Sequence, residues 1–396
     1  MAKVPPIPLE EAQARLLDLA GPLPTEHVDI EGSVGRYLAE PLLARRTQPA
    51  ADLSAMDGYA VTADDFAGPW QVVGESAAGH PYSGEVRKGQ AIQVSTGALL
   101  PAGAASVILQ EDLARKDHEI TLTGEAPMPA HKHIRPCGLD FRQGSEVIAS
   151  GSLIGPADAA LAIAAGHKHL PVCRKPRVTV IDSGDELSSD PEACAPHQIP
   201  ASNGAMLLAM ARKLPVNAER SGPVADTLDA LINAFDMANH ADVIVTSGGA
   251  SVGEHDLVRP ALEAWGASLD FWRVAIKPGK PILVARRERR TGPQIVIGLP
   301  GNPVSSFVTA YHFMLPLLRR MLGARYALPM RIATRLGAPI RGIWNGEFVV
   351  PHTLQDSGAL SALAASNVLI DRPARAPEGA EGDEVRVFLL QNGGIA

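Results

Sequence analysis

Hydrophobic residues recur at helical spacing near the start of the chain and again around position 160. Residues 9–20 carry apolar side chains three or four positions apart, which places them on one face of a helix. Residues 156–165 repeat this spacing, with Pro156 in the first turn and Gly166 just beyond the end. Neither helix is long enough to bury its apolar face alone, so we expect the two to pack against each other.

A different pattern fills residues 48–139, where short runs of β-favouring residues are divided by Gly and Pro. The runs lie at residues 59–61, 71–73, 92–94 and 106–109. Short runs separated by turn residues are typical of an all-β domain. Similar runs return from residue 327 and predict a second small β domain at the C-terminal end.

Between residues 176 and 326, strands alternate with helices. Apolar runs predict strands at residues 177–182, 241–246, 282–285 and 294–297. Helical spacing predicts helices at residues 203–213, 224–238, 257–265 and 303–322. This alternation indicates an α/β domain with a mostly parallel sheet and helices on both faces. Ligands of such sheets bind at the carboxyl ends of the strands, so the loops after Ile181, Thr246 and Ile297 form the candidate site.

Length and composition narrow the class of protein. A chain of 396 residues is long enough for two or three domains, each with its own core. The 36 Lys and Arg against 43 Asp and Glu give a net charge of -7, which argues against a protein that binds nucleic acid by neutralising phosphates. The 37 Gly and 33 Pro indicate many turns and loops.

The cysteines and the apolar stretches predict a cytoplasmic protein. Cys137, Cys173 and Cys194 form neither an even disulfide framework nor a closely spaced metal-binding pair, which favours a reducing compartment. The sequence does not begin with the apolar run of a signal peptide, and it has no apolar stretch of about 18 residues that could span a membrane. We therefore expect neither a membrane nor a nucleic-acid partner.

Two glycine-containing segments follow predicted strands and are candidate anion sites. Residues 246–256 read TSGGASVGEHD, and residues 298–306 read GLPGNPVSS. Glycines let backbone N–H groups approach a ligand, and serines add hydroxyl donors. The alternatives are a Gly-Gly turn that only links strand to helix, and a helix start in which Asn302 and Pro303 serve only as capping residues.

Charged residues beside these segments add candidate chemistry. Glu254 and Asp256 follow the first segment, and carboxylates beside an anion site suggest an oxygen-ligated cation such as Mg²⁺. Residues 276–281, IKPGKP, hold two lysines across a turn, which would attract a dianion unless they are ordinary surface lysines. Residues 182–187, DSGDEL, supply either a helix cap or a metal or base site. In SAMDGYAV at residues 54–61, Asp57 could also belong to an ordinary Asp-Gly turn.

Taken together, these strings resemble the molybdopterin molybdenumtransferase family, which includes bacterial MoeA and the gephyrin E domain. Seven segments match in the family's order: SAMDGYAV, TGALLPAGAASVIL, GDEL, SNG, TSGGASVGEHD, IKPGKP and GLPGNPVS, between residues 54 and 305. The end segments also fit the family's length, so the resemblance covers essentially the whole chain.

The resemblance implies an elongated homodimer of four-part subunits. The parts would be a helical and dimerisation segment at residues 1–47 and 140–175, a small β domain at 48–139, a MogA-like α/β domain that binds molybdopterin at 176–326, and a C-terminal β barrel at 327–396. It also implies an active site in which the α/β domain of one subunit faces the β domain of the other.

The implied reaction is the last step of molybdenum cofactor synthesis. Adenylylated molybdopterin and molybdate would react, with Mg²⁺, to give the molybdenum dithiolene and AMP, and a MogA-like molybdopterin adenylyltransferase would be the pathway partner. The alternatives are a molybdopterin carrier that does not insert metal, and a molybdopterin adenylyltransferase.

The resemblance also assigns roles to individual residues. The expected catalytic residues are Asp57, Asp140, Glu186, Asp226, Asp256 and Lys277, of which Asp57, Glu186 and Asp256 would bind metal. The expected residues for substrate binding are Thr96, Gly97, Ser247, Gly248, Gly249, Ser251, Gly253, Arg273, Lys280, Pro300, Gly301, Asn302 and Ser305. The sequence departs from the family's pattern at His133, Leu139, His197, Ala201 and Arg273, the last of which replaces a lysine.

Overall fold

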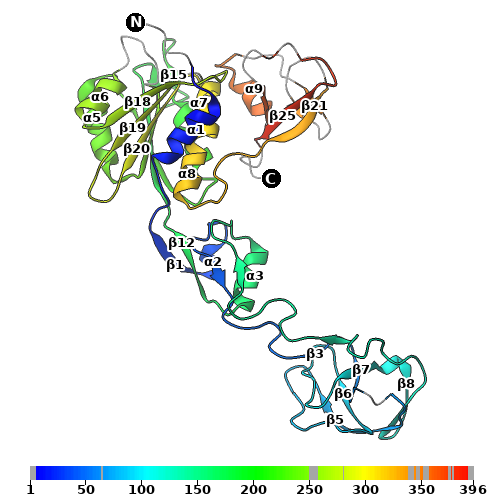
Figure 1. Ribbon diagram of the computed structural model, residues 1–396. Coiled ribbons are helices and arrows are strands. Elements are labelled where there is room, and N and C mark those ends of the chain that lie inside the picture. Colours follow the sequence, from blue (N-terminus) through cyan, green and yellow to red (C-terminus); the bar gives the residue numbers. More distant parts are fainter. Residues whose placement is uncertain are drawn as a thin grey trace.

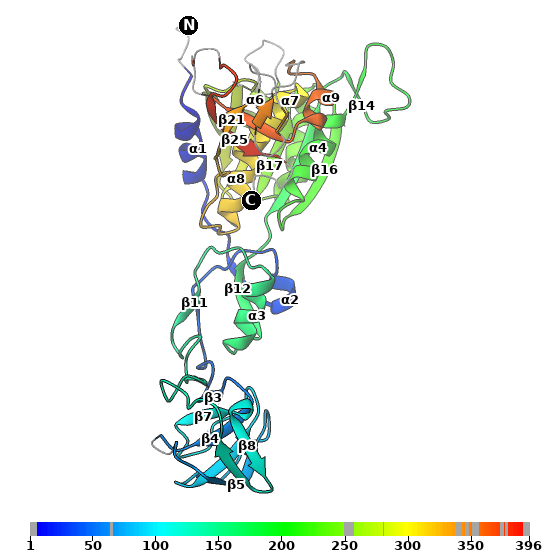
Figure 2. The ribbon, with the colours of Figure 1, turned by 90° about the vertical axis from the view of Figure 1, so that its right-hand side faces the viewer.

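The chain folds into an elongated molecule whose parts follow one another along a single axis. The computed structural model describes residues 6–63, 66–248, 257–279, 281–337, 343–344, 348–350, 356–372, 376 and 379–390. In Figures 1 and 2, an α/β domain and a C-terminal sheet lie side by side at one end, a small middle segment follows, and a β domain lies at the other end. The chain therefore starts at the α/β end, runs out to the β domain and returns.

The β domain is built on a six-stranded sheet in the order β7-β4-β6-β5-β9-β8. Strand β4 (Gly58–Val61) is buried along its whole length, because Tyr59 and Val61 enter one hydrophobic cluster and Ala60 enters another. The four predicted runs lie in β4 to β7 and are confirmed as strands. The other elements are β3 (Leu53–Ser54), β5 (Trp70–Ser76), β6 (Gln90–Val94), β7 (Ser106–Leu109), η1 (Gln110–Asp112), β8 (Leu113–Lys116), β9 (Glu119–Leu122) and β10 (Ile134–Arg135), which pairs with β3.

The middle segment joins two chain stretches that lie far apart in sequence. Its elements are β1 (Thr25–Asp29), α2 (Ile30–Ser33), β2 (Leu42–Leu43), β11 (Glu146–Ile148), α3 (Pro156–Ala164) and β12 (His169–Cys173). Strand β1 pairs with β12 and β2 pairs with β11, both antiparallel. Leu38, Ile154 and Leu170 are buried in its small core. The two crossings of the chain are thus joined by hydrogen bonds and by a shared core.

The first helix does not pack against α3, so that expectation was wrong. Helix α1 (Leu9–Asp18) buries Ala12 and Leu16 in the core of the α/β domain, at the end of the molecule (Figure 1). Its apolar face covers α8 (Leu315–Met321). Spacing showed that α1 needs a partner, but it could not show which of two apolar surfaces would supply one.

The α/β domain has a six-stranded sheet in the order β16-β13-β17-β20-β19-β18. The strands are β13 (Arg177–Ser183), β16 (Asn217–Val224), β17 (Val243–Ser247), β18 (Ser268–Arg273), β19 (Pro281–Arg287) and β20 (Gln294–Leu299), and a separate pair is formed by β14 (Leu187–Ser188) and β15 (Ile199–Pro200). The first four strands of the order are parallel, whereas β19 and β18 are antiparallel to their neighbours. The mostly parallel sheet is confirmed. Its edge is antiparallel because β19 and β20 are joined by a short turn, and parallel strands need a long crossover connection.

Helices cover both faces of this sheet, as predicted. One face carries α1, α4 (Ser202–Ala211) and the long C-terminal helix, and the other carries α5 (Leu228–Met237) and α6 (Val258–Ala264). A 3₁₀ turn, η2 (Ala238–His240), follows α5. The predicted helix from residue 224 begins four residues later, because residues up to Val224 belong to the unpredicted strand β16.

The helix predicted at residues 303–322 is continuous but contains a π-helical turn. It consists of α7 (Pro303–Thr309), the π segment η3 (Ala310–Met314) and α8. Pro316 has no N–H to donate to the carbonyl of His312. That carbonyl instead accepts a hydrogen bond from Nε2 of Gln13 at 3.0 Å. The break in the helical ladder therefore becomes the point at which α1 is attached.

The C-terminal sheet contains β21 (Ile332–Leu336), β22 (Ile343–Trp344), β23 (Phe348–Val350), β24 (Val368–Asp371) and β25 (Glu384–Leu389), with α9 (Leu360–Ala365). Its order is β22-β23-β21-β25-β24. Within the described residues the two end strands do not pair, and the barrel stays a prediction. Arg331 joins the sheet to α1, because its guanidinium lies 2.6 Å from Glu10 and 3.0 Å from Asp371.

The described helices include none with the length and apolar character needed to cross a membrane.

His312 provides a test of this packing. Burial, together with the positive charge of Arg331, lowers its pKa from 6.5 to about 4, so the folded state holds the ring neutral. Since the unfolded chain binds the proton more readily, the stability due to neutral His312 is present above pH 6.5 and is lost as the pH falls toward 4. The destabilisation caused by His312→Met should therefore be smaller at pH 5 than at pH 7, by about 2 kcal/mol.

Urea unfolding at the two pH values measures this difference. Phe313→Leu supplies a matched control in the same helical turn, since it changes no titratable group and should cost the same at both. An equal effect of His312→Met at pH 5 and pH 7 would show that the ring is not held neutral by its surroundings.

Candidate functional site

The ends of three parallel strands form one level row. Asp182 of β13 lies opposite Ser247 of β17, which in turn lies opposite Leu299 of β20. Strand β13 begins at Arg177, shortly after the middle segment ends at Cys173. The carboxyl end of β13 therefore points away from the middle segment, toward the end of the molecule (Figures 1 and 2). The loops that the sequence singled out leave the sheet along this edge.

Gly248 has a backbone conformation that only glycine adopts readily. Its φ is +110°, its N–H donates to the carbonyl of Leu299 at 3.0 Å, and its carbonyl accepts from the hydroxyl of Thr246 at 3.0 Å. Ser247 is buried beside it. The remaining residues predicted in this loop lie outside the described residues: Gly249, Ser251, Gly253, Glu254 and Asp256.

The loop after β20 is fixed by a contact from helix α4. The side-chain amide of Asn203 donates from Nδ2 to the carbonyl of Gly301 at 2.6 Å. Asn302 precedes α7 and Pro303 opens it, but the side chain of Asn302 does not cap the helix. Ser305 and Ser306 are buried in the first turn. Capping by the Asn302 side chain therefore does not explain this sequence.

Three polar atoms in this region are buried without a hydrogen-bond partner among the described residues. They are Oδ1 of Asp182, Oδ1 of Asn203 and the hydroxyl oxygen of Ser306. Leaving such groups unpaired costs about 1 to 3 kcal/mol each. Native proteins retain unpaired groups of this kind mainly where a ligand or water completes them. Oδ1 of Asn203 can only accept, whereas the Ser306 hydroxyl can also donate to an anion.

The buried carboxylate of this row, Asp182, forms an ion pair with Arg220, whose side chain is partly exposed. The carboxylate of Asp182 is fully buried and accepts from Nε of Arg220 at 2.7 Å. Arg220 also donates from Nη2 to the carbonyl of Ala201 at 2.7 Å, just before α4. Burial raises the pKa of Asp182, and the charge and hydrogen bond of Arg220 partly oppose this. Arg220 was missed in the sequence, because it lies in the unpredicted strand β16.

Gly204 leaves the space for this ion pair. A Cβ atom at position 204 would lie 2.0 Å from Oδ2 of Asp182 and 2.7 Å from Nε of Arg220. The Ser-Asn-Gly sequence thus combines Asn203, which holds the loop after β20, with a glycine that admits the carboxylate. Ala201, directly before α4, contributes its backbone carbonyl to Arg220.

Acidic residues gather where the loop after β13 meets the loop after β16. Asp185 and Asp226 accept from each other's backbone N–H, with N···O distances of 3.1 Å to Oδ1 of Asp185 and 3.4 Å to Oδ2 of Asp226. Burial raises the pKa of Asp226, and the negative charges of Asp185 and Glu186 add to this rise. Glu186 itself is exposed. The structure therefore places the predicted Glu186 and Asp226 in one cluster, and it adds Asp185.

These carboxylates fit a magnesium ion only as part of its ligand set. Repulsion that raises the pKa of Asp226 would be relieved by a cation, and carboxylate oxygens are the ligands that Mg²⁺ prefers. However, the described residues of this chain hold no group of three His, Cys, Asp or Glu side chains positioned to bind a metal ion. We therefore derive no chemical step through magnesium.

The turn that carries Lys277 packs against α7. Gly279 has a φ of +102°, and a Cβ there would lie 2.8 Å from Cγ2 of Thr309 and 3.2 Å from the carbonyl of Ser305. Lys277 is exposed at this turn, so its ammonium group is accessible. Arg273 lies at the end of β18, opposite Pro281. Lys280 lies outside the described residues.

Asp57 belongs to a second polar group, on the β domain. Its Oδ1 accepts from the backbone N–H of Thr96 at 2.6 Å and from the Thr96 hydroxyl at 3.0 Å. These two hydrogen bonds lower the pKa of Asp57, so the exposed carboxylate is ionised at neutral pH. Gly97 donates to the carbonyl of Ser54 at 2.8 Å. The two sequence motifs of the β domain therefore meet at Asp57.

Asp140 is separate from both groups. It is exposed where the β domain joins the middle segment, and its N–H donates to the carbonyl of Gln48 at 3.1 Å. Among the described residues, no hydrogen bond or ion pair links Asp140 to Asp57 or to the strand ends of the α/β domain.

Comparison with known proteins matches the chain along most of its length. Three family models match: the MoeA N-terminal region, domains I and II, at residues 7–166; a probable molybdopterin binding domain at 179–320; and the MoeA C-terminal region, domain IV, at 339–390. A molybdopterin molybdenumtransferase of Haemophilus influenzae is 33% identical over 321 residues, 80% of this chain and 78% of that protein. The chain belongs to the MoeA family.

Further MoeA proteins extend the match to nearly the whole chain. A molybdopterin molybdenumtransferase of Nostoc is 32% identical over 390 residues, 92% of this chain and 89% of that protein. The crystal structure of a molybdopterin biosynthesis MoeA protein from Pyrococcus horikoshii superposes with a TM-score of 0.82 at 30% identity, covering 97% of this chain and 99% of that one. The resemblance predicted from the motifs is confirmed.

One chain of this MoeA protein does not bring its two polar groups together. The Asp57 group lies on the β domain, and the strand ends lie on the α/β domain, with the middle segment between the two domains (Figures 1 and 2). A metal site made of Asp57 and Glu186 is therefore not formed within a single chain.

Gly204→Ala tests whether the buried ion pair organises the site. Alanine in a helix is normally about 1 kcal/mol more stable than glycine. Here the added methyl group would overlap Asp182 and Arg220, and such overpacking costs about 1 to 3 kcal/mol. We expect lower stability in urea unfolding. Gly21→Ala is the control, because a Cβ at Gly21 meets no atom within 4 Å. Stabilisation by Gly204→Ala would mean that the ion pair rearranges freely.

Proposed function

We propose that this protein is a molybdopterin molybdenumtransferase that inserts molybdenum from molybdate into adenylylated molybdopterin and releases AMP. The observation that carries the proposal is the match to a relative of that name over 92% of the chain, spanning the α/β domain, the β domain and the segments between them. The polar row at the strand ends supports it, because ligands of α/β sheets bind at this edge.

The chemistry of the substrates suits the described residues. Molybdate is a dianion and adenylylated molybdopterin carries phosphates, so both need positive charge and hydrogen-bond donors. Lys277 would supply charge: an ion pair at about 4 Å contributes roughly 4 kcal/mol at an effective dielectric constant of 20, before desolvation. The Ser306 hydroxyl would supply a donor, and Gly248 and Gly301 let the backbone approach a ligand.

The substrate brings its own sulfur ligands for molybdenum, so the reaction requires no protein thiol. The described cysteines agree with this, since Cys137 and Cys194 are half-buried and Cys173 is buried, far apart in the sequence. The protein's contribution would be to hold molybdate and the dithiolene together while water cleaves the phosphoanhydride bond to AMP. A carboxylate would accept the proton of that water.

A second copy of the chain would complete the site. In the elongated chain, the ionised Asp57 is separated from the α/β strand ends, and in a homodimer it would face those of the partner. The remaining ligands of Mg²⁺ would then come from both subunits. A molybdopterin adenylyltransferase would be the pathway partner, since the adenylylated substrate must be formed before it reaches this site.

The activity assay is direct. Purified protein with adenylylated molybdopterin, molybdate and Mg²⁺ should release AMP and yield active cofactor, and combining Glu186→Ala with Asp57→Ala should abolish both. Tight molybdopterin binding without molybdate-dependent AMP release would favour the carrier function, which the arginine at position 273 suggests. Adenylylation of molybdopterin from ATP would favour the adenylyltransferase.

Mixed dimers test whether each site is shared between two chains. Heterodimers of one Asp57→Ala chain and one Glu186→Ala chain would contain one intact site, formed by Asp57 of one chain and Glu186 of the other. Purified through two different tags, they should therefore recover roughly half of the wild-type activity, although each homodimeric variant is inactive.

The matched control combines Glu186→Ala with Lys277→Ala. Both residues lie on the α/β domain, so each site of this heterodimer keeps one substitution and should stay inactive. Recovery in the control, or none in the Asp57 and Glu186 pair, would contradict a site shared in this way.

A further inference from the structure

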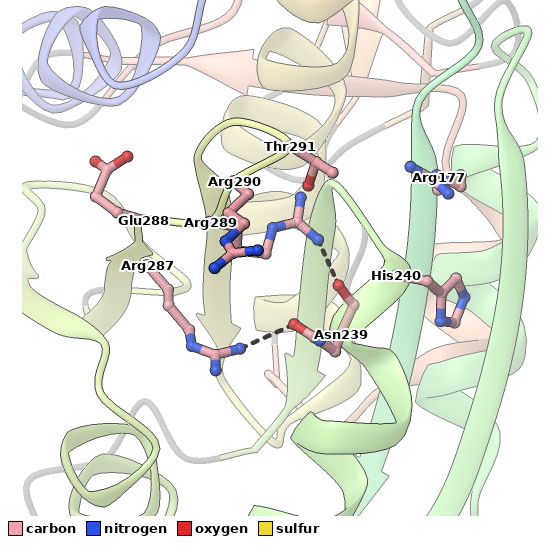
Figure 3. Close-up of a pocket in the computed structure, with 8 residues that line it drawn as sticks. All are labelled: Arg177, Asn239, His240, Arg287, Glu288, Arg289, Arg290 and Thr291. Carbon is pink, nitrogen blue, oxygen red and sulfur yellow. Dashed lines mark hydrogen bonds between the residues drawn. The ribbon is translucent and has the colours of Figure 1, made fainter.

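The amino-terminal edge of the α/β sheet, opposite the candidate site, carries a hollow lined by arginines. Its volume is about 470 Å³, and it lies between the start of β13, the turn η2, and the turn that joins β19 to β20 (Figure 3). The arginines that line it are Arg177, Arg287, Arg289 and Arg290, and the ring of His240, which lies 2.9 Å from Glu219, lines it as well. A second hollow of about 390 Å³ shares Arg177 and adds Arg174 and Lys175. Positive charge is thus concentrated on one edge of a protein whose net charge is -7.

The acidic residues that line these hollows are paired with other arginines. Glu288 lies 2.6 Å from Arg286, and Glu26 pairs with Arg36. Neither Arg286 nor Arg36 lines the hollows. These two carboxylates therefore neutralise little of the positive charge of the arginines that line the hollows.

The buried Asp242 is shared among several guanidinium groups. Arg174 binds both of its carboxylate oxygens, at 2.7 and 2.8 Å. Arg177 and Arg289 reach only 3.9 and 3.7 Å from it. One carboxylate thus faces three arginines, and Arg174 has the close contacts.

Arg289 is a buried cation that is only partly neutralised. Its side chain is 10% exposed, and its Nε atom has no hydrogen-bond partner among the described residues. One of its terminal nitrogens donates to the carbonyl of Asn239. Burial lowers the pKa of Arg289, and the nearby positive charges of Arg177, Arg287 and Arg174 lower it further, against the opposing effect of Asp242.

Arg287 is already oriented in the structure. Its guanidinium lies 4.0 Å above the ring of Trp265, and it donates to Oδ1 of Asn239 at 2.9 Å (Figure 3). Stacking and a hydrogen bond together fix the plane of the group. Arg290 is exposed on the next turn. A ligand would therefore meet groups that are partly arranged in advance, which lowers the entropy lost on binding.

We propose that this edge is a second binding site, for a small anion that carries a phosphate or pyrophosphate group. Guanidinium groups match phosphate oxygens with two parallel hydrogen bonds, and several of them around one hollow suit more than one negative charge. The larger hollow has the size of sites for small molecules. Because Arg287 covers the ring of Trp265, the site recognises the phosphoryl oxygens and not an aromatic base. It lies apart from the transferase site.

The test is calorimetric titration of the full-length protein with inorganic pyrophosphate, at an ionic strength of about 0.1 M and without magnesium. Wild type should bind, and Arg287→Gln combined with Arg290→Gln should weaken binding at least about tenfold, because two charged donors are lost. In a Lys277→Ala background, which removes a charge of the transferase site, the Arg287 and Arg290 substitutions should weaken binding by the same factor, which separates this site from the transferase site. The result therefore does not depend on whether the protein is a transferase.

The matched control removes the same charge elsewhere. Arg45 and Arg46 are exposed in the middle segment, and Arg45→Gln with Arg46→Gln should leave binding within about twofold of wild type, because long-range charge is screened. Equal weakening in the control, no binding by wild type, or loss with Lys277→Ala alone would each overturn the proposal. A glutamate oligomer that binds as tightly as pyrophosphate, and whose binding the Arg287 and Arg290 substitutions also abolish, would overturn it too. The edge would then recognise acidic peptides.

Discussion

The ion pair between Asp182 and Arg220 is the constraint on which the candidate site depends. Asp182 is the last residue but one of β13, so its burial places a carboxylate under the loops that leave that edge. Arg220 pairs with it at 2.7 Å and binds the carbonyl before α4, which fixes where that helix begins. Because α4 begins there, Asn203 reaches the carbonyl of Gly301 and holds the loop before α7. Removing the Arg220 guanidinium would leave the fully buried Asp182 carboxylate without its charged partner, at a cost of about 3 to 5 kcal/mol.

The pKa of a buried carboxylate is shifted in opposite directions at the two edges of the same sheet. At the carboxyl edge, Asp182 has one arginine, and burial dominates, so its pKa is raised. At the amino edge, burial alone would raise the pKa of Asp242, but hydrogen bonds from Arg174 and from the N–H of Arg177, with their charges, lower it overall. Asp182 thus serves as a structural anchor beneath polar loops, whereas Asp242 is the counter-charge of an arginine cluster.

The sequence predicted the strands and helices that are marked by their own hydrophobic pattern. It missed the elements whose place is set by packing against other parts of the fold. Strands β13, β17 and β20 are rich in Val and Ile because they are buried on both faces. Strand β16 is an edge strand with a polar sequence, and β18 contains a central aspartate, so neither shows this composition. Arg220 was missed because it lies in the unpredicted strand β16. Glu186, Asp226 and Asp57 were found through the resemblance to the family. No local pattern could show that α1 packs on α8 instead of α3.

The elongated shape makes distance within the chain a functional constraint. A two-stranded crossing with a small core connects the β domain to the α/β domain, and the helix α1 is attached at the far end by Gln13. Asp57 is held ionised by Thr96, and the two motifs that meet at Asp57, residues 54–61 and 96–109, contain no lysine or arginine. The lysine-bearing turn and the unpaired donor of Ser306 lie on the other domain. The acid and the cation therefore lie on different domains of one chain. A second chain related by a twofold axis is the simplest arrangement that would bring them together, since symmetry would form two such sites at once.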